Sequence, residues 1–279
     1  GGQPIGAIGG DSLAKMIRES REYSDIRALV LRVGSGGGSV FASEVIRQEI
    51  LEFKKAGNPM VISMGAMAAS GGYWIAADAD EIWASPVTLT GSIGIFAAIP
   101  TFEESLSAMG IYNDGVGTTG LASALNITRP LSPLLKESIA ISLRHGYEQF
   151  LDIVANGRSM DNDKVSTVAE GRVFDGAAAQ QIGLVDKLGT MDDAIQSAAR
   201  LAGLDEPNGL YINKPSSVQD ENTQNIEGKA ASMFGSVTIP QFLHSTLHRV
   251  FAPIKALMIL NAPTGLYVNY MMHVSSLFA

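Results

Sequence analysis

The sequence predicts an α/β fold in which helices cover a mostly parallel sheet. Three short apolar runs, at residues 26–33, 60–64 and 81–84, have the composition of buried strands. Segments with the apolar spacing of helices lie between them, and glycine-rich turns follow the first two runs. Strands that alternate with helices at short spacing are typical of parallel sheets. Ligands in such folds bind at the carboxyl ends of the strands, where both glycine turns fall.

The other elements follow from the same patterns along the chain. Helices are expected at residues 10–22, 41–56, 102–110, 134–154, 161–169, 177–182 and 191–202, and from Ser70 to about residue 79. A strand is expected at 111–116, and glycine-punctuated turns or short strands at 88–96, 171–176 and 183–189. Residues 117–133 contain two prolines and many small polar residues, which predicts a long irregular loop with a functional or partner-facing role.

Composition narrows the possible classes of function. The 279 residues carry a formal net charge of −8, which argues against nucleic acid as the main partner. Cysteine is absent, so disulfides, cysteine nucleophiles and thiolate metal sites are excluded. No apolar run reaches about 18 residues, so no membrane-spanning helix is expected. The sequence begins Gly-Gly-Gln-Pro, without methionine or an apolar leader, which predicts a processed or excised piece.

Three regions differ in composition. Residues 1–204 are expected to form one compact domain. Residues 205–232 are polar with few apolar anchors, which predicts a flexible segment. Residues 233–279 are apolar again, which predicts a helical or irregular extension that packs on another subunit or near a membrane surface.

The segment from Met64 to Trp74 is the best candidate for chemistry. It places one serine, Ser70, among alanines and two glycines, between a β-branched run and an apolar helix-like run. Glycine tolerates the dihedral angles of a tight strand-to-helix turn, and free N–H groups at a helix start favour negative charge. This combination suits a nucleophile and its oxyanion. The alternative is a packing turn where a helix crosses a sheet closely.

Serine needs a base to take its proton, and the histidines do not suit that role. His145 lies in an expected helix beside Arg144 and is interpreted as a surface residue. His244 and His248 stand four apart without the glutamate of the metalloprotease pattern, in a peripheral segment that also contains His273. A Ser-His-Asp triad is therefore not supported. A neutral lysine, with a pKa lowered by burial, remains as the base.

The glycine loop from Gly34 to Ser39 offers a second part of a site. Its backbone N–H groups could bind a phosphate or an oxyanion. It lacks the Gly-Lys-Ser/Thr ending of a phosphate-binding P-loop, and it does not continue as a GxGxxG nucleotide motif. The oxyanion interpretation is therefore the better functional one, and its alternative is an ordinary strand-to-helix turn.

Three motifs, at residues 31–44, 64–74 and 89–95, resemble the signal peptide peptidase A family, and in particular the C-terminal half of its long, two-repeat bacterial form. The resemblance spans residues 9 to about 202. It implies a ClpP/crotonase-like fold of repeated ββα units with flanking helices. It also implies a serine–lysine peptidase that degrades released signal peptides. By position, Ser70 is the implied nucleophile, Ser92 the residue that holds the lysine, and Gly37 and Gly71 the oxyanion-hole donors.

The sequence departs from the family pattern in two places. Gly34 and Gly36 replace the asparagine and proline of the family loop, which leaves the N–H donors in place. Gly120 stands about where the single-repeat form has its lysine, and the next lysine, Lys136, is interpreted as a surface residue. In the two-repeat form the lysine comes from the N-terminal repeat. We therefore expect a serine-bearing half that binds peptide but hydrolyses it poorly alone.

Further expectations concern substrate and setting. Tyr73, Trp74 and Phe96 could line apolar substrate pockets, or belong to the core. No metal or organic cofactor is implied. The resemblance and the apolar tail suggest a ring-like homo-oligomer, and the family implies the periplasmic face of a bacterial inner membrane. Two alternatives stay open: a catalytically silent structural subunit, and a crotonase-type acyl-CoA enzyme, against which Ser70 counts.

Overall fold

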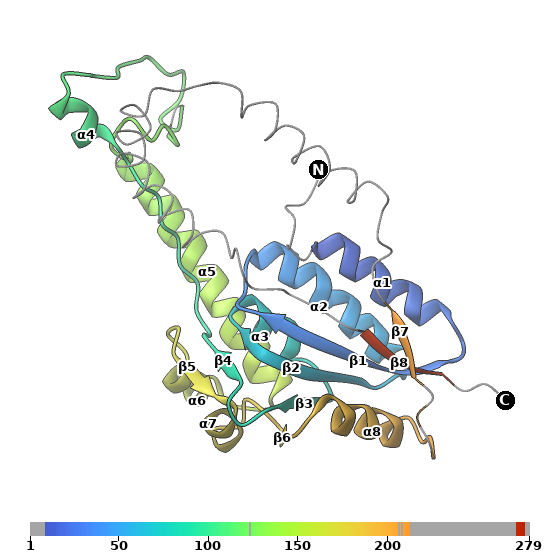
Figure 1. Ribbon diagram of the computed structural model, residues 1–279. Helices are drawn as coiled ribbons and strands as arrows, with labels where there is room; N and C mark the ends of the chain where they lie inside the picture. The colour runs from blue at the N-terminus through green and yellow to red at the C-terminus, as the bar shows by residue number, and fades with distance from the viewer. Residues whose placement is uncertain (1–8, 123, 206, 208, 213–271, 277–279) are drawn as a thin grey trace, which may run out of the picture. The chain divides into compact units, whose positions relative to one another are not determined.

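The computed structural model describes residues 9–122, 124–205, 207, 209–212 and 272–276 (Figure 1). Residues 8–211 and 269–279 cluster into one compact unit. A second unit, residues 1–7 and 212–268, has only Ile212 among the described residues. The predicted polar segment and apolar extension therefore lie largely outside the described part of the chain.

The described strands form one mixed, mostly parallel sheet, which confirms the predicted α/β class (Figure 1). They are β1 (Ile26–Ser35), β2 (Met60–Ala69), β3 (Glu81–Ala84), β4 (Leu89–Gly91), β5 (Val173–Asp175), β6 (Lys187–Leu188), β7 (Gly209–Ile212) and β8 (Met272–Ser276). The order is β5-β4-β2-β1-β8-β7, and β3 pairs with β2 and β6. Pairing is parallel for β1–β2, β2–β3, β2–β4 and β3–β6, and antiparallel for β1–β8 and β4–β5.

The helices lie close to the predicted positions. They are α1 (Gly10–Glu22), α2 (Val40–Lys55), α3 (Gly71–Ala76), α4 (Glu103–Ala108), α5 (Pro133–Gly157), α6 (Asn162–Val168), α7 (Gly176–Gln181) and α8 (Met191–Leu201). Side-chain caps fix several starts: the Ser39 hydroxyl accepts from the Ala42 N–H, and Thr190 and Asp193 form a capping box. None of the described helices combines the length and hydrophobicity that a bilayer crossing requires.

The core lies on both faces of β1 and β2. On one face α8 packs against the sheet, and this cluster consists of Ala28, Val30, Val61, Trp83, Ala194, Ile195 and Ala198. Alternate residues Leu29 and Leu31 point to the opposite face, where α1 and α2 lie (Figure 1). Ile46, Ile50 and Phe53 of α2 are fully or almost fully buried. Burial on both faces explains why the strands read as continuous apolar runs.

Strand β2 is longer than predicted. It continues past Met64 to Ala69, because β1 pairs with it as far as Ala68 and β4 pairs with residues 67–69. The extension contains glycine and alanine instead of β-branched residues, so composition alone favoured a turn there. The consequence is that Ser70 directly follows a strand.

Two other expectations need correction. Residues 111–116 do not form a strand; Tyr112 is 80% and Val116 fully exposed, and no described strand pairs with them. The predicted turn at 171–176 contains β5, which gains strand character by pairing with β4.

The first half of α5 is largely exposed, whereas Phe150, Ile153 and Val154 near its C-terminal end are buried.

Candidate active site

Ser70 occupies a sharp turn between β2 and α3. Its backbone has φ 51° and ψ −120°, a conformation that non-glycine residues rarely adopt and that is often found at functional sites. Two hydrogen bonds hold it: the Ser70 N–H donates to the Gly91 carbonyl at 2.9 Å, and the Trp74 N–H donates to the Ser70 carbonyl at 2.9 Å. The side chain does not cap α3. The half-buried hydroxyl is thus left free by the helix that it precedes.

The glycine loop packs directly against the serine turn. A Cβ at Gly37 would lie 2.7 Å from the Ser70 Cβ and 2.9 Å from the Gly71 nitrogen, and Gly37 has φ +109°. A Cβ at Gly72 would lie 2.8 Å from the Ser35 carbonyl oxygen. Only glycine lets the two turns approach this closely. The structure therefore brings the 34–39 loop and the Ser70 turn together, as the strand order requires.

Two backbone amides, those of Gly71 and Gly38, lie close to the Ser70 turn. Gly71 is the first residue of α3, so its N–H has no partner within the helix. A Cβ at Gly71 would lie 3.1 Å from the Gly38 nitrogen, so the two residues approach each other closely. The Gly37 N–H instead donates to the Ser35 hydroxyl at 3.1 Å. The Gly37 amide thus has a partner within its own loop, and the roles of Gly37 and Gly71 as oxyanion-hole donors stay predictions.

The backbone of Ser92 lies next to the turn that contains Ser70. It has φ 51° and follows Gly91, whose carbonyl accepts the Ser70 N–H. The Ser92 N–H donates to the Arg172 carbonyl at 2.7 Å. No hydrogen bond joins the Ser92 and Ser70 hydroxyls, and Ser92 is not among the residues that line the cavity beside Ser70. Its role in holding a lysine stays a prediction.

An apolar cavity of about 90 Å³ opens beside Ser70. It is lined by Gly38, Val40, Ser70, Gly71, Trp74, Gly94, Ile95, Phe96 and Phe150. The Trp74 and Phe150 rings pack with their centroids 4.7 Å apart and their planes inclined at 44°. Phe96 is 86% exposed, so it stands at the open side of the cavity. Of the three aromatic residues named from the sequence, Trp74 and Phe96 thus lie at this cavity.

Tyr73 points elsewhere. It is fully buried, and its hydroxyl donates to the Leu184 carbonyl at 2.8 Å. Burial raises the pKa of the Tyr73 hydroxyl well above its ordinary value, so the group stays neutral at physiological pH. Consecutive helical residues point in directions about 100° apart, which separates Tyr73 from Trp74. Tyr73 is placed in the core, away from the cavity.

Replacing Tyr73 with phenylalanine is expected to lower the free energy of unfolding by about 1–2 kcal/mol, because the Leu184 carbonyl would lose its buried donor. Urea denaturation measures the change. Peptide binding at the Ser70 cavity should stay the same. A loss of binding with unchanged stability would instead place Tyr73 at the substrate.

No described histidine or lysine lines the Ser70 cavity. Four of the described lysines form ion pairs with carboxylates elsewhere: Lys15 with Glu19, Lys54 with Asp80, Lys55 with Glu52 and Lys187 with Glu81. Lys136 and Lys164 are exposed on α5 and α6, and His145 is exposed on α5. The other three histidines lie where side chains are not described. The described lysines and the described histidine thus lie away from the Ser70 cavity.

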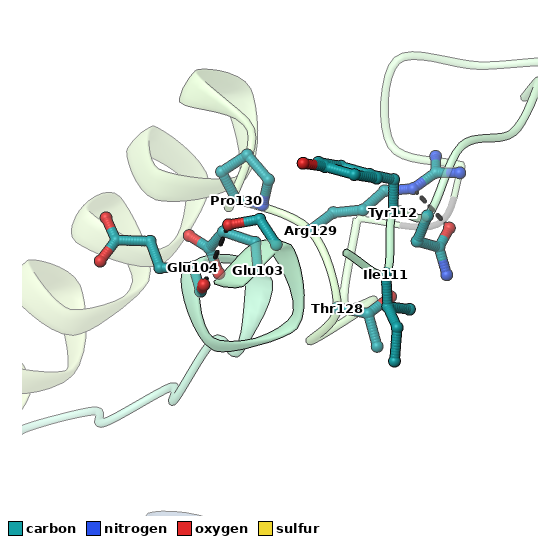
Figure 2. Close-up of a pocket in the computed structure, with 9 residues that line it drawn as sticks. Glu103, Glu104, Ile111, Tyr112, Thr128, Arg129 and Pro130 are labelled. Carbon is teal, nitrogen blue, oxygen red and sulfur yellow. Dashed lines mark hydrogen bonds between the residues drawn. The ribbon is translucent and has the colours of Figure 1, made fainter. Parts of the chain in front are cut away.

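A second, larger cavity of about 270 Å³ lies between α4 and the segments around residues 112 and 129 (Figure 2). Glu103 and Glu104 line it from α4, and Tyr112 and Arg129 line it from the irregular segments. The Arg129 side chain donates to the Asn113 side chain at 2.9 Å. Its lining shares no residue with the Ser70 cavity and offers no activated nucleophile. Size alone therefore does not identify the reactive site.

No group of side chains suited to holding a metal occurs among the described residues.

The comparison with known families decides the assignment. Residues 52–205, more than half of the chain, match peptidase family S49. The chain belongs to family S49. The matched region contains Ser70, Gly71 and Ser92, and an S49 assignment supports a serine peptidase. It also agrees with the resemblance to signal peptide peptidase A that the three sequence motifs indicated.

Individual S49 relatives extend the match. The chain is 42% identical to "Protease 4" of Salmonella typhi over 270 residues, which cover 96% of this chain and 44% of that protein. It is 32% identical to "Putative signal peptide peptidase SppA" of Enterococcus faecium over 181 residues, which cover 65% of this chain and 53% of that protein. The chain thus spans about half the length of these relatives. A solved structure, that of a ClpP1 mutant from Listeria monocytogenes, superposes with a TM-score of 0.46 at 14% identity over 66% of this chain and 86% of that one.

Proposed function

We propose that this chain is the serine-bearing half of a serine–lysine endopeptidase that cleaves apolar peptides, released signal peptides among them. The observation that carries the proposal is the placement of Ser70. Its hydroxyl stands at a strained turn, beside two backbone amides and an apolar cavity. These are a nucleophile, an oxyanion site and a side-chain pocket in one place.

The reaction follows from these parts. A neutral lysine amine takes the Ser70 hydroxyl proton while the Oγ attacks the peptide carbonyl carbon. The carbonyl oxygen becomes an oxyanion, which the Gly71 and Gly38 N–H groups stabilise. The C–N bond then breaks, and the leaving amine takes the proton from the lysine. Water, deprotonated by the same lysine, hydrolyses the acyl-enzyme and regenerates the Ser70 hydroxyl.

The lysine is assigned to a second unit, either an N-terminal repeat or a neighbouring subunit. The described lysines lie away from the Ser70 cavity. The S49 relatives are about twice as long as the matched region, which leaves room for a second repeat. Exposed apolar residues on the segment that leaves the site, namely Phe96, Tyr112, Val116 and Leu125, offer surface for such a unit or for further copies. An oligomer at the periplasmic face of the inner membrane is part of this proposal.

The isolated chain is expected to bind an apolar peptide and to cleave it at least about 1,000-fold more slowly than the assembled enzyme, because an unassisted serine hydroxyl is a weak nucleophile. Peptide hydrolysis by the chain alone, and by the chain with its lysine-bearing unit, measures the difference. Turnover by the isolated chain at the full rate would contradict the division of the dyad.

A catalytically silent subunit is the second candidate, favoured by the lysines lying elsewhere among the described residues. A fluorophosphonate probe separates the two functions. Covalent labelling of Ser70 in the assembled enzyme is expected for a peptidase. Absence of labelling, in a protein that is folded and assembled, would favour the silent subunit.

A further inference from the structure

An ionic cluster outside the Ser70 cavity holds one of the side chains that line it. Trp74 lines the cavity, and its indole Nε1 donates to a Glu44 carboxylate oxygen at 2.7 Å. Glu44 lies on α2 and does not itself line the cavity. The edge of the indole is thus held by Glu44, while its ring packs on Phe150. These two contacts together fix the orientation of the ring.

Glu44 is in turn held in place. The Arg47 Nε donates to the same Glu44 oxygen at 2.8 Å, and the Arg47 Nη2 donates to the other oxygen at 3.0 Å. Arg47 also forms an ion pair with Asp78, just beyond the end of α3. The contacts form a closed ring from Trp74 of α3 through two residues of α2 to Asp78. A bidentate arginine–carboxylate pair of this kind restricts the position of both side chains.

The Glu44 side chain is ionised in this setting. Burial alone would raise its pKa, but hydrogen bonds from Arg47, Gln48 and Trp74 outweigh burial and lower the pKa of the Glu44 carboxyl below its ordinary value. An ionised acceptor holds an N–H donor more tightly than a neutral one. The indole is therefore anchored by a charge at neutral pH.

We propose that Glu44 is a positioning residue of the substrate site, which fixes the Trp74 indole as a wall of the cavity and so limits the size of the side chain that the cavity accepts. The proposal rests on the proposed peptidase function. The cavity measures about 90 Å³. A cavity of roughly 150 Å³ holds a benzene ring. With the indole fixed, the cavity admits an aliphatic side chain such as leucine more readily than a phenyl ring.

The structure offers a matched control for Glu44. The second tryptophan, Trp83, donates its indole N–H to Glu81 at 2.9 Å, and Glu81 also pairs with Lys187. Neither Trp83 nor Glu81 lines the Ser70 cavity. Glu81→Gln therefore alters an equivalent indole–carboxylate contact away from the site, and it reports what a purely structural contact contributes.

The experiment compares Glu44→Gln, Glu44→Asp and Glu81→Gln in the assembled enzyme, with peptides that differ only by leucine or phenylalanine at the cavity position. Glu44→Gln removes the charge, and Glu44→Asp keeps the charge but shortens its reach. Both Glu44 variants are expected to lower the leucine-to-phenylalanine ratio of kcat/KM by about tenfold, mainly through a higher KM for the leucine peptide. Glu81→Gln is expected to leave the ratio unchanged. An unchanged ratio in both Glu44 variants, or an equal fall in Glu81→Gln, would overturn the proposal.

Two further readouts separate this proposal from the proposed function. In the ¹⁵N-tryptophan-labelled chain, Glu44→Gln is expected to shift the Trp74 indole N–H signal and leave that of Trp83 in place; an unmoved Trp74 signal would count against the anchor. In the assembled enzyme, labelling of Ser70 by a small fluorophosphonate that does not fill the cavity should proceed equally in the wild type and Glu44→Gln. Failure of wild-type labelling would overturn the peptidase function itself. Normal labelling with unchanged selectivity would overturn only the role of Glu44.

Discussion

Replacing Ser70 with alanine is expected to lower the kcat/KM of the assembled enzyme by about 10,000-fold or more, because loss of a peptidase nucleophile removes the covalent pathway. The fold should persist. Alanine keeps the Cβ, so the strained backbone at φ 51° is the same in both proteins, and the Ser70 side chain does not cap α3. Peptide hydrolysis and thermal unfolding measure the two quantities.

Ser159 provides the control for this substitution. It has φ 50° and is exposed, outside the Ser70 cavity. Ser159→Ala is expected to retain full activity, and its effect on stability should match that of Ser70→Ala to within about 0.5 kcal/mol. If Ser70→Ala kept more than about a tenth of the activity with intact fluorophosphonate labelling elsewhere on the chain, Ser70 would not be the nucleophile.

Replacing Gly37 with alanine is expected to lower kcat/KM by about 100-fold and the free energy of unfolding by about 1–3 kcal/mol. The new Cβ would lie 2.7 Å from the Ser70 Cβ and 2.9 Å from the Gly71 nitrogen, so the loop or the serine turn has to move. The backbone at φ +109° also disfavours any side chain. Steady-state kinetics and chemical denaturation test the two effects.

Gly57 separates backbone strain from displacement of the site. It has φ +87° and a Cβ there would meet nothing within 4 Å. Gly57→Ala should therefore cost about 1 kcal/mol in stability and leave catalysis unchanged. Full activity in Gly37→Ala would show that the glycine loop does not support the Ser70 turn.

The position of Ser70 at a strand-to-helix turn could be predicted because a β-branched run precedes the glycine–alanine segment and an apolar helix-like run follows it. The full length of β2 could not, because residues 65–69 gain strand character from pairing with β1 and β4 instead of from their own propensity. Residues 111–116 show the opposite case, since apolar composition predicted a strand where no described partner strand lies beside it. Whether a segment becomes a strand depends on a partner strand beside it, and the local sequence does not show whether that partner is present.

Within the candidate site, the sequence indicated the loop and the turn but not the contacts of the individual groups. Gly37 and Gly38 are chemically identical, but in the fold the Gly37 amide donates to the Ser35 hydroxyl and a Cβ at Gly37 would meet Ser70, whereas a Cβ at Gly38 would meet nothing within 4 Å. From the sequence, the adjacent aromatic residues Tyr73 and Trp74 are equally good candidates for a substrate pocket. In α3, however, the Tyr73 side chain contacts Leu184 and the Trp74 side chain lines the cavity. The role of Glu44 depends on a contact with a residue thirty positions away.

Strand β2 changes neighbours along one edge: residues 61–63 pair with β3, and residues 67–69 pair with β4. Between them the Thr88 hydroxyl donates to the Gly65 carbonyl at 2.8 Å in place of a ladder bond. The half that carries Ser70 is thus attached to the short β4–β5 ribbon, and the other half to the deep core. Amide exchange should divide along this line, with the ribbon opening independently of the core.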